Sequence, residues 1–204
     1  MVDKQLRRRG IRDPRVLEAM RQIPREEFIP PDSRLLAYSD DPVPIGLGQT
    51  ISQPYMTALM AELLELTGTE TVLEVGAGCG YAAAVLGRLA ARVMALEIVP
   101  SLARAAEANL KRTGTGANVE LRAGDGSLGC LEWAPYDAIS VAAAAPEIPV
   151  SLLAQLRDPG RLVIPVGQRQ DQELRVVVKR NGRIDYRVAT LCRFVPLIGG
   201  EGWQ

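Results

Sequence analysis

Residues 71–81, TVLEVGAGCGY, decide what kind of fold this sequence can adopt. The first five residues are mostly apolar and β-branched, which is typical of a short strand buried in a sheet. Gly76, Gly78 and Gly80 follow at once, and a helical pattern of apolar residues begins at Tyr81. Glycines at such a strand-to-helix turn let the backbone approach a ligand closely. The segment therefore predicts an α/β fold with a ligand site at the carboxyl end of this strand.

The spacing of the glycines limits which ligand is expected. Gly-x-Gly-x-Gly lacks the two-residue gap before the last glycine that marks dinucleotide-binding sites. Taken alone, these glycines fit a tight structural turn as well as a ligand loop.

Strand and helix patterns alternate along the rest of the chain. Strands separated by helices of this length are typical of a parallel, doubly wound sheet. Near the C-terminus, two strand patterns flank Asn181 and Gly182, and Asn-Gly is a strong signal for an antiparallel hairpin. We therefore expect a Rossmann-like, doubly wound, mostly parallel seven-stranded sheet with a C-terminal antiparallel hairpin. The parallel strands are predicted at 71–75, 92–97, 118–124, 136–143 and 160–166, and the helices at 54–66, 81–90, 100–114 and 150–156.

The N-terminal part of the chain has a different character. Val16, Leu17 and Met20 recur at helical spacing. They follow Asp13, an expected N-cap, and Pro14, which suits the first helical position. We expect a helical extension that packs on the sheet.

Charge and histidine content exclude several classes of protein. The 24 basic and 24 acidic residues cancel, so no overall field would concentrate nucleic acid or an anionic membrane. The three arginines at 7–9 fit a solvated face, and we expect no nucleic-acid partner. No histidine is present, which excludes serine–histidine hydrolases, cysteine–histidine proteases and histidine-ligated zinc sites. We expect no metal site.

The cysteines and the apolar stretches favour a cytoplasmic protein. Cys79, Cys130 and Cys192 are odd in number and far apart, which favours reduced thiols over a disulfide framework or a zinc ribbon. No stretch approaches the roughly 20 apolar residues of a membrane span, and the first residues lack the apolar centre of a signal peptide. We expect no membrane partner.

Two later strand ends add acidic residues to the glycine turn. Glu97 ends the next predicted strand, where a carboxylate can accept hydrogen bonds from both hydroxyls of a ribose. Asp125 and Gly126 follow the strand after that, where a carboxylate can receive an adenine amino group. Because the carboxyl ends of parallel strands meet at one edge of a sheet, these residues predict a nucleoside pocket. The alternative for Glu97 is a solvated residue at a strand end.

An uncharged segment, PIGLGQTISQPY at 44–55, precedes the helix predicted from Pro54. Its side chains at Thr50, Ser52 and Gln53 offer neutral hydrogen-bond donors, and its glycines would let a loop fold over a ligand. Ser52 could instead only cap the helix, and the two interpretations are compatible.

These motifs, taken together, resemble a known family. VLEVGAGCGY, ALE, AGDGS and YDAISVAAAAPEIP resemble the class I S-adenosylmethionine-dependent methyltransferases. AMRQIPREEFIP, VPIGLGQTISQPYMTALM and RFVPLIGGEGW narrow the resemblance to the protein-L-isoaspartate O-methyltransferase family. The resemblance covers nearly the whole chain, and GQTISQP with RFVPL is specific to that family rather than to methyltransferases in general.

The resemblance implies a reaction and a set of site residues. The enzyme would move the methyl group of S-adenosylmethionine to the free α-carboxyl of L-isoaspartyl residues in damaged proteins and peptides, as a monomer. Ser52 would be the catalytic residue, beside the substrate carboxylate. The residues expected to bind the cofactor are Glu74, Gly76, Ala77, Gly78, Gly80, Tyr81, Glu97, Asp125 and Gly126. Those expected to bind the substrate are Val43, Thr50, Ile51, Ser52, Gln53, Phe194, Val195, Pro196 and Leu197.

By the same resemblance, residues 1–204 form a single methyltransferase domain. Residues 1–53 would be the N-terminal helical extension and active-site loop, and residues 54–204 the cofactor-binding sheet. Three positions depart from the commoner pattern of the family, because Ala82, Ala142 and Leu47 stand where Gln, Thr, and Tyr or His are frequent. These departures could alter cofactor affinity or peptide preference.

The chemistry agrees with the missing histidine. A free α-carboxyl, with a pKa of about 3.5, is already ionised at pH 7, so it needs no general base. Catalysis then reduces to holding a carboxylate oxygen in line with the methyl group and the sulfur. Neutral donors position that carboxylate without lowering its nucleophilicity.

Three alternatives stay open. A methyltransferase for another acceptor is disfavoured by GQTISQP, and a nicotinamide-dependent oxidoreductase by the missing Gly-x-Gly-x-x-Gly. The third alternative is a non-catalytic module that binds isoaspartyl damage. Only an activity assay distinguishes such a module from an enzyme. Tyr55 and Tyr81 fit packing as well as a site wall, and Cys79 needs only to be small.

Overall fold

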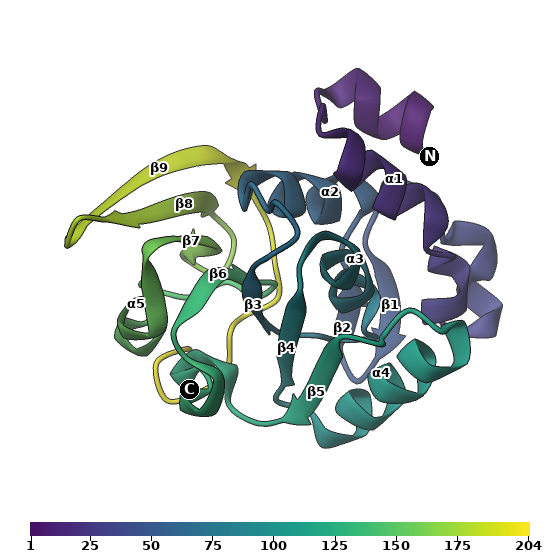
Figure 1. Ribbon diagram of the computed structural model, residues 1–204. Helices are drawn as coiled ribbons and strands as arrows, with labels where there is room; N and C mark the ends of the chain where they lie inside the picture. Colours follow the sequence, from purple (N-terminus) through teal and green to yellow (C-terminus); the bar gives the residue numbers. More distant parts are fainter.

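A seven-stranded sheet runs through the centre of the molecule (Figure 1). The computed structural model describes residues 1–204 and gives the strand order β5-β4-β3-β6-β7-β8-β9. Neighbours from β5 to β7 pair in parallel, whereas β8 pairs antiparallel with both β7 and β9. The strands are β3 (Thr71–Val75), β4 (Arg92–Glu97), β5 (Val119–Ala123), β6 (Tyr136–Val141), β7 (Leu156–Gly167), β8 (Gln172–Arg180) and β9 (Arg183–Cys192). The predicted Rossmann-like sheet with its antiparallel hairpin is confirmed.

Helices cover both faces of this sheet. Buried residues of α1, α2 and α3 pack on one face, and buried residues of α5 pack on the other. The helices are α1 (Pro14–Gln22), α2 (Pro54–Leu63), α3 (Tyr81–Leu89), α4 (Pro100–Thr113) and α5 (Val150–Gln155). Short helical turns are η1 (Val2–Leu6), η2 (Arg7–Arg9), η3 (Arg25–Phe28), η4 (Pro31–Leu36), η5 (Gly126–Leu128) and η6 (Leu131–Trp133). None of the helices combines the length and the apolar character that crossing a bilayer requires.

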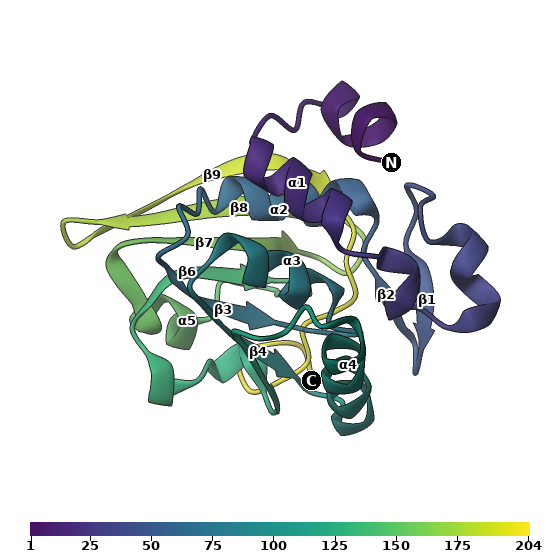
Figure 2. The same cartoon turned by 45° about the vertical axis from the view of Figure 1, so that its right-hand side comes forward.

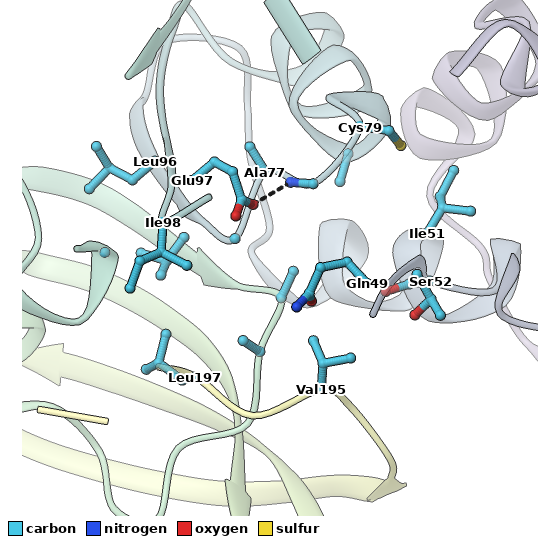
Figure 3. Close-up of a pocket in the computed structure, with 18 of the residues that line it drawn as sticks. Gln49, Ile51, Ser52, Ala77, Cys79, Leu96, Glu97, Ile98, Val195 and Leu197 are labelled. Carbon is cyan, nitrogen blue, oxygen red and sulfur yellow. Dashed lines mark hydrogen bonds between the residues drawn. The ribbon is translucent and has the colours of Figure 1, made fainter. Parts of the chain in front are cut away.

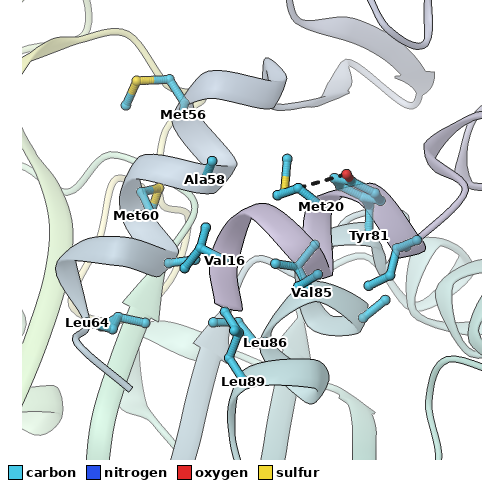
Figure 4. Packing of buried hydrophobic residues seen from close by; sticks show 14 of the residues in the cluster. Val16, Met20, Met56, Ala58, Met60, Leu64, Tyr81, Val85, Leu86 and Leu89 are labelled. Atoms are coloured by element: carbon cyan, nitrogen blue, oxygen red, sulfur yellow. Dashed lines mark hydrogen bonds between the residues drawn. The ribbon is translucent and has the colours of Figure 1, made fainter. Parts of the chain in front are cut away.

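The N-terminal extension shares its core with the sheet. α1 begins as predicted, because the Asp13 side chain accepts a hydrogen bond from the Arg15 amide at 2.8 Å and Pro14 occupies the first helical position. Its apolar face, which includes Met20, lies against α2 and α3 (Figure 4). One continuous cluster of 33 buried residues joins these helices to Val72 of β3. The extension therefore packs as part of the same body.

Residues 43–51 form a small hairpin that the sequence patterns did not predict. β1 (Val43–Gly46) pairs antiparallel with β2 (Gln49–Ile51). Strands of four and three residues are too short to show a reliable alternation of apolar and polar residues. Leu47 and Gly48 form the turn, with φ of 53° and 73°. Leu47 therefore has a left-handed backbone conformation, which is energetically unfavourable for a branched side chain.

The predicted Asn-Gly hairpin is confirmed. Asn181 and Gly182 have φ of 53° and 72°, the left-handed values that a two-residue turn between antiparallel strands requires. The Asp158 carboxylate accepts hydrogen bonds from both turn amides, at 2.8 and 2.6 Å. Figures 1 and 2 show that the β8–β9 hairpin extends away from the helices, and the turn that Asp158 supports is its tip.

A close approach between β3 and the segment after β5 requires a glycine. A Cβ added at Gly126 would overlap the Val75 side chain, whereas a Cβ added at Gly124 would meet nothing within 4 Å. The first glycine of AGDGS is therefore dispensable for packing, and the second is not.

We expect Gly126→Ala to lower the free energy of unfolding by about 1–3 kcal/mol, the usual result of overpacking a core position. Gly124→Ala is the matched control and should change it by less than about 0.5 kcal/mol. Urea denaturation of both variants measures the difference. Equal stabilities would mean that the Val75 contact relaxes without strain.

Candidate active site

A cavity opens at the carboxyl ends of β3 and β4 (Figure 3). It encloses about 810 Å³ of space when its open mouth is included. Figure 3 shows Glu97 and Ala77 on one side, Ser52 and Gln49 on a second, and Val195 and Leu197 on a third. The predicted site residues that line it are Thr50, Ile51, Ser52, Gly76, Ala77, Gly78, Tyr81, Glu97, Gly126, Val195, Pro196 and Leu197. The glycine turn (residues 76–80), the loop at residues 49–53, called the acceptor loop below, and the C-terminal segment (residues 194–204) therefore meet in space.

Other lining residues were not among those predicted to bind cofactor or substrate, although Ala82 and Ala142 were expected to influence binding. They are Gln49, Thr57, Val75, Cys79, Ala82, Leu96, Ile98, Ala142, Ala143 and Ile198. Most are chain neighbours of predicted residues. Ala142 and Ala143 follow β6, and the rule that parallel strands end at one edge would have identified them.

The glycine turn owes its shape to left-handed backbone angles. Gly76, Gly78 and Gly80 have φ of 85°, 56° and 87°. Gly80 does not line the cavity; it is the N-cap of α3, and a Cβ there would lie 3.2 Å from Ala106 of α4. Helix packing thus explains why this residue is a glycine, and the expectation that Gly80 binds the cofactor stays a prediction.

Glu97 is buried beneath the turn rather than solvated, so the alternative of an exposed strand end is wrong. Its carboxylate accepts hydrogen bonds from the Gly78 amide at 2.8 Å and from the Val99 amide at 3.0 Å (Figure 3). The side chain therefore holds the glycine turn while it lines the cavity.

Glu74 lies in β3 with 1% of its surface exposed, and neither carboxylate oxygen has a hydrogen-bond partner. Burial, reinforced by the negative charge of Glu97, raises the pKa of Glu74 to about 8. Glu74 does not line the cavity, and with this pKa it is mostly protonated at neutral pH; a cationic ligand nearby would lower its pKa and favour the carboxylate.

Asp125 is occupied by the C-terminal segment. Its carboxylate accepts hydrogen bonds from the Ser127 amide at 2.9 Å, the Ser127 hydroxyl at 2.7 Å and the Gly200 amide at 2.7 Å. Burial acts to raise its pKa, but these hydrogen bonds outweigh burial and hold the pKa of Asp125 below its usual value. Asp125 lies outside the cavity wall, and its neighbour Gly126 lines it.

Ser52 does not cap α2, so that interpretation is wrong. The N-cap residue is Gln53, without a side-chain hydrogen bond. The Asp40 carboxylate instead accepts a hydrogen bond from the Tyr55 amide at 3.0 Å, from a position 15 residues earlier. The Ser52 hydroxyl has no partner within the chain and faces the cavity (Figure 3).

A second groove adjoins the cavity. It encloses about 1140 Å³ including open solvent, and shares Thr50, Ser52, Ala142 and Val195 with the cavity. The predicted substrate residues Gln53 and Phe194 line it. The two spaces therefore meet at Ser52, as a donor site and an acceptor site must.

Val43 supports this region without lining either space. It is buried and pairs with Ile51 across the β1–β2 hairpin. Tyr81 is also buried, and its hydroxyl lies 3.6 Å from the Met20 sulfur (Figure 4), so it serves packing and the cavity wall together. Burial raises the pKa of the Cys79 thiol to about 11, which makes that thiol a poor nucleophile.

The three departures from the family pattern fall in two places. Ala82 and Ala142 both line the cavity, and both also border a small inner space beneath Ser52. Leu47 lies at the exposed tip of the β1–β2 hairpin, outside both spaces. Only the first two can change the shape of the cavity.

Comparison with known proteins gives one consistent result. The family model for protein-L-isoaspartate(D-aspartate) O-methyltransferase matches residues 1–202. Protein-L-isoaspartate O-methyltransferase 2 of Pelobacter propionicus is 54% identical over 100% of this chain and 91% of its own. The enzyme of Methanoculleus marisnigri is 52% identical over 100% of this chain and 92% of its own.

A solved structure agrees. The putative protein-L-isoaspartate O-methyltransferase of Plasmodium falciparum, in complex with S-adenosyl-L-homocysteine, superposes with a TM-score of 0.83 at 30% identity. The match covers 95% of this chain and 94% of the Plasmodium chain.

The raised pKa of Glu74 predicts a specific pH dependence of stability. Its pKa rises from 4.5 to about 8 on folding, so the folded protein keeps a proton that the unfolded chain releases between these values. Stability is therefore lost as the pH rises from about 4.5 to about 8. Because glutamine does not ionise, we expect the ligand-free Glu74→Gln variant to gain stability over the parent as the pH rises.

Urea unfolding at pH 5 and pH 9 measures this effect. The difference in the free energy of unfolding between variant and parent should be larger at pH 9. The same difference at both pH values would contradict a buried, unpartnered carboxylate.

Proposed function

The chain belongs to the protein-L-isoaspartate(D-aspartate) O-methyltransferase family, and we propose that it performs that family's reaction where the cavity and the groove meet. The reaction moves the methyl group of S-adenosylmethionine to the free α-carboxyl of an L-isoaspartyl residue. The ester then collapses through a succinimide and returns part of the damaged protein to the normal aspartyl linkage. The observation that carries the assignment to this site is that Ser52 lines both spaces.

The residues of the cavity fit this cofactor. A nucleoside joined to a cationic amino acid needs hydrogen-bond acceptors for its ribose and negative charge near its ammonium group. Glu97 offers a carboxylate at the end of β4, and Glu74 adds a buried acid without a hydrogen-bond partner, which a nearby ammonium group would help to ionise. We propose that Gly76, Ala77 and Gly78 border the methionine part, and that Glu97 binds the ribose.

Gly126 and Asp125 were both predicted to bind the cofactor, and we propose a different role for each. Gly126 borders the adenine, because it lines the cavity. Asp125 acts mainly through its hydrogen bonds to Ser127 and Gly200, which hold the C-terminal segment beside the cavity.

The acceptor needs position rather than activation. When bound, S-adenosylmethionine supplies a methyl group activated by the adjacent sulfonium. The free α-carboxyl of the substrate, with a pKa of about 3.5, is ionised at neutral pH, so no residue has to remove a proton. The absence of histidine is consistent with this reaction.

We propose that Ser52 donates a hydrogen bond from its hydroxyl to the acceptor carboxylate. Ser52 accepts a hydrogen bond from Arg25 through its carbonyl, and its hydroxyl, which belongs to a residue that lines the cavity, makes none within the chain. A neutral donor orients the carboxylate but leaves its charge largely in place, so the oxygen stays nucleophilic. Thr50, Ile51 and Gln53 shape the same loop.

The C-terminal segment closes the site from the other side. The amide of Leu197 donates to the Ala144 carbonyl at 2.8 Å, and the amide of Ala144 donates to the Val195 carbonyl at 2.8 Å. Phe194 faces the acceptor groove, and its amide donates to the Gln172 side chain at 2.7 Å. We propose that these mostly apolar side chains flank the peptide and exclude water.

We further propose that residues 1–204 form one domain, and that it acts in the cytoplasm as a monomer that binds no nucleic acid. All three cysteines are free, which suits a reducing compartment. Arg7 and Arg9 form ion pairs with Asp3 and Asp40, which reduces the free charge of the basic run. Sedimentation analysis would measure the oligomeric state.

The first experiment is transfer of labelled methyl from S-adenosylmethionine to a synthetic peptide with one L-isoaspartyl residue. The same peptide with ordinary aspartate is the matched control. We expect base-labile label on the isoaspartyl peptide alone. Cofactor binding without label on either peptide would support another acceptor or a non-catalytic module.

Ser52→Ala should reduce kcat/KM for the isoaspartyl peptide by roughly 10- to 100-fold, the usual effect of losing a hydrogen bond to a charged group. Calorimetry should find the affinity for S-adenosylhomocysteine nearly unchanged. The melting temperature should also stay constant, because the hydroxyl has no partner in the free protein. The exposed Ser101→Ala substitution in α4 is the control. A lower melting temperature with normal turnover would contradict the proposed role.

A further inference from the structure

Arg25 is the largest charged side chain in the core and has no carboxylate partner. None of its surface is exposed, and it forms no ion pair. The neighbouring acids are used elsewhere, because Glu26 accepts a hydrogen bond from the Tyr38 hydroxyl and Glu27 pairs with Arg34 and Arg112. Burial lowers the pKa of Arg25, but an arginine in a protein keeps its charge at neutral pH.

The guanidinium of Arg25 joins three segments of the chain. Its Nε donates to the Ala37 carbonyl of the N-terminal extension at 2.7 Å, and its Nη2 donates to the Ser52 carbonyl at 2.7 Å. Its central carbon lies 4.9 Å from the centre of the Tyr81 ring, which lines the cavity. Arg25 therefore links the acceptor loop directly to the wall of the cofactor cavity.

Stability alone is a poor explanation for this arrangement. A buried charge without a counter-ion loses its hydration, and Nη1 of Arg25 also lacks any hydrogen-bond partner. An apolar side chain of similar length would fill the same volume without that loss. What an apolar side chain cannot do is hold the Ser52 carbonyl and carry a positive charge behind the loop.

We propose that Arg25 is a positioning residue for methyl transfer. It fixes the backbone of Ser52 against Tyr81, and so sets the distance between the serine hydroxyl and the cofactor cavity. Its charge lies behind the neutral donors of the loop, where it favours an anionic acceptor without contacting the reacting oxygen. The inference rests on the proposed function, because it assigns Arg25 a part in placing the acceptor carboxylate.

Two substitutions at Arg25 separate its two properties. Arg25→Lys keeps the charge but loses the planar pair of donors, and Arg25→Met loses both. We expect kcat/KM for the isoaspartyl peptide to fall at least about tenfold in Arg25→Met, mainly through KM, and less in Arg25→Lys. The affinity for S-adenosylhomocysteine should change by less than about threefold in Arg25→Lys. Hydrogen exchange of the amides at 49–53 should be faster in both variants.

Arg15 provides a matched control outside the site. Its guanidinium also donates hydrogen bonds to backbone carbonyls, those of Leu66 and Leu89, and neither residue lines the cavity or the groove. Arg15→Met should lower the melting temperature but leave the peptide KM and the exchange of residues 49–53 unchanged.

The role of Arg25 is overturned if folded Arg25→Lys matches the parent in peptide KM and in exchange of residues 49–53. It is equally overturned if Arg25→Met changes only the melting temperature, as Arg15→Met should. If Arg25→Met does not fold, Arg25→Lys decides the question. Failure of the parent protein to methylate the isoaspartyl peptide would instead contradict the proposed function, and the exchange measurement would still test whether Arg25 orders the loop.

Discussion

Parallel pairing at the carboxyl ends of β3, β4 and β6 is the constraint on which the whole site depends. Val75 lies level with Leu96 of β4 and Val141 of β6, so three loops leave the sheet at one edge. The pairing continues into the first loop, because the amides of Gly76 and Ala77 both donate to the Leu96 carbonyl. The glycine turn is therefore a fixed extension of the sheet. A cofactor bound against it would have a defined position relative to every other element.

Buried groups of opposite charge lie on the two sides of the region where methyl transfer is proposed. Beneath the glycine turn, Glu97 has only backbone donors, and Glu74 is buried with a pKa raised to about 8, so it keeps its proton at neutral pH until a cationic cofactor lies beside it. Behind the acceptor loop, Arg25 is buried without a counter-ion. Both arrangements are unfavourable in the ligand-free protein, and both become favourable when ligands of opposite charge bind. Between them, Ser52 presents a neutral hydroxyl, so neither buried charge touches the reacting atoms.

The sequence predicted the features that depend on local chemistry. The glycine turn, the Asn181-Gly182 hairpin and the Asp13 cap follow from backbone requirements of a few adjacent residues, and all three are confirmed. Features that depend on distant contacts were not predicted. Asp40 supports the start of α2 from another segment, and Arg25 bonds to carbonyls far along the chain. No pattern within a short window distinguishes these two residues from ordinary surface charges.

The same limit applies to roles that the resemblance assigned residue by residue. Gly80 and Asp125 stand in the right motifs, yet one is explained by packing on α4 and the other by hydrogen bonds to the C-terminal segment. A reaction whose nucleophile is already ionised makes few demands on reactive side chains and strong demands on distance. In the proposed function, residues that hold the two loops in place, such as Asp125 and Arg25, therefore matter alongside the residues that touch the ligands. In the proposed function the N-terminal extension is part of the catalytic unit for that reason, because it contains Arg25 and the loop that lines the cavity.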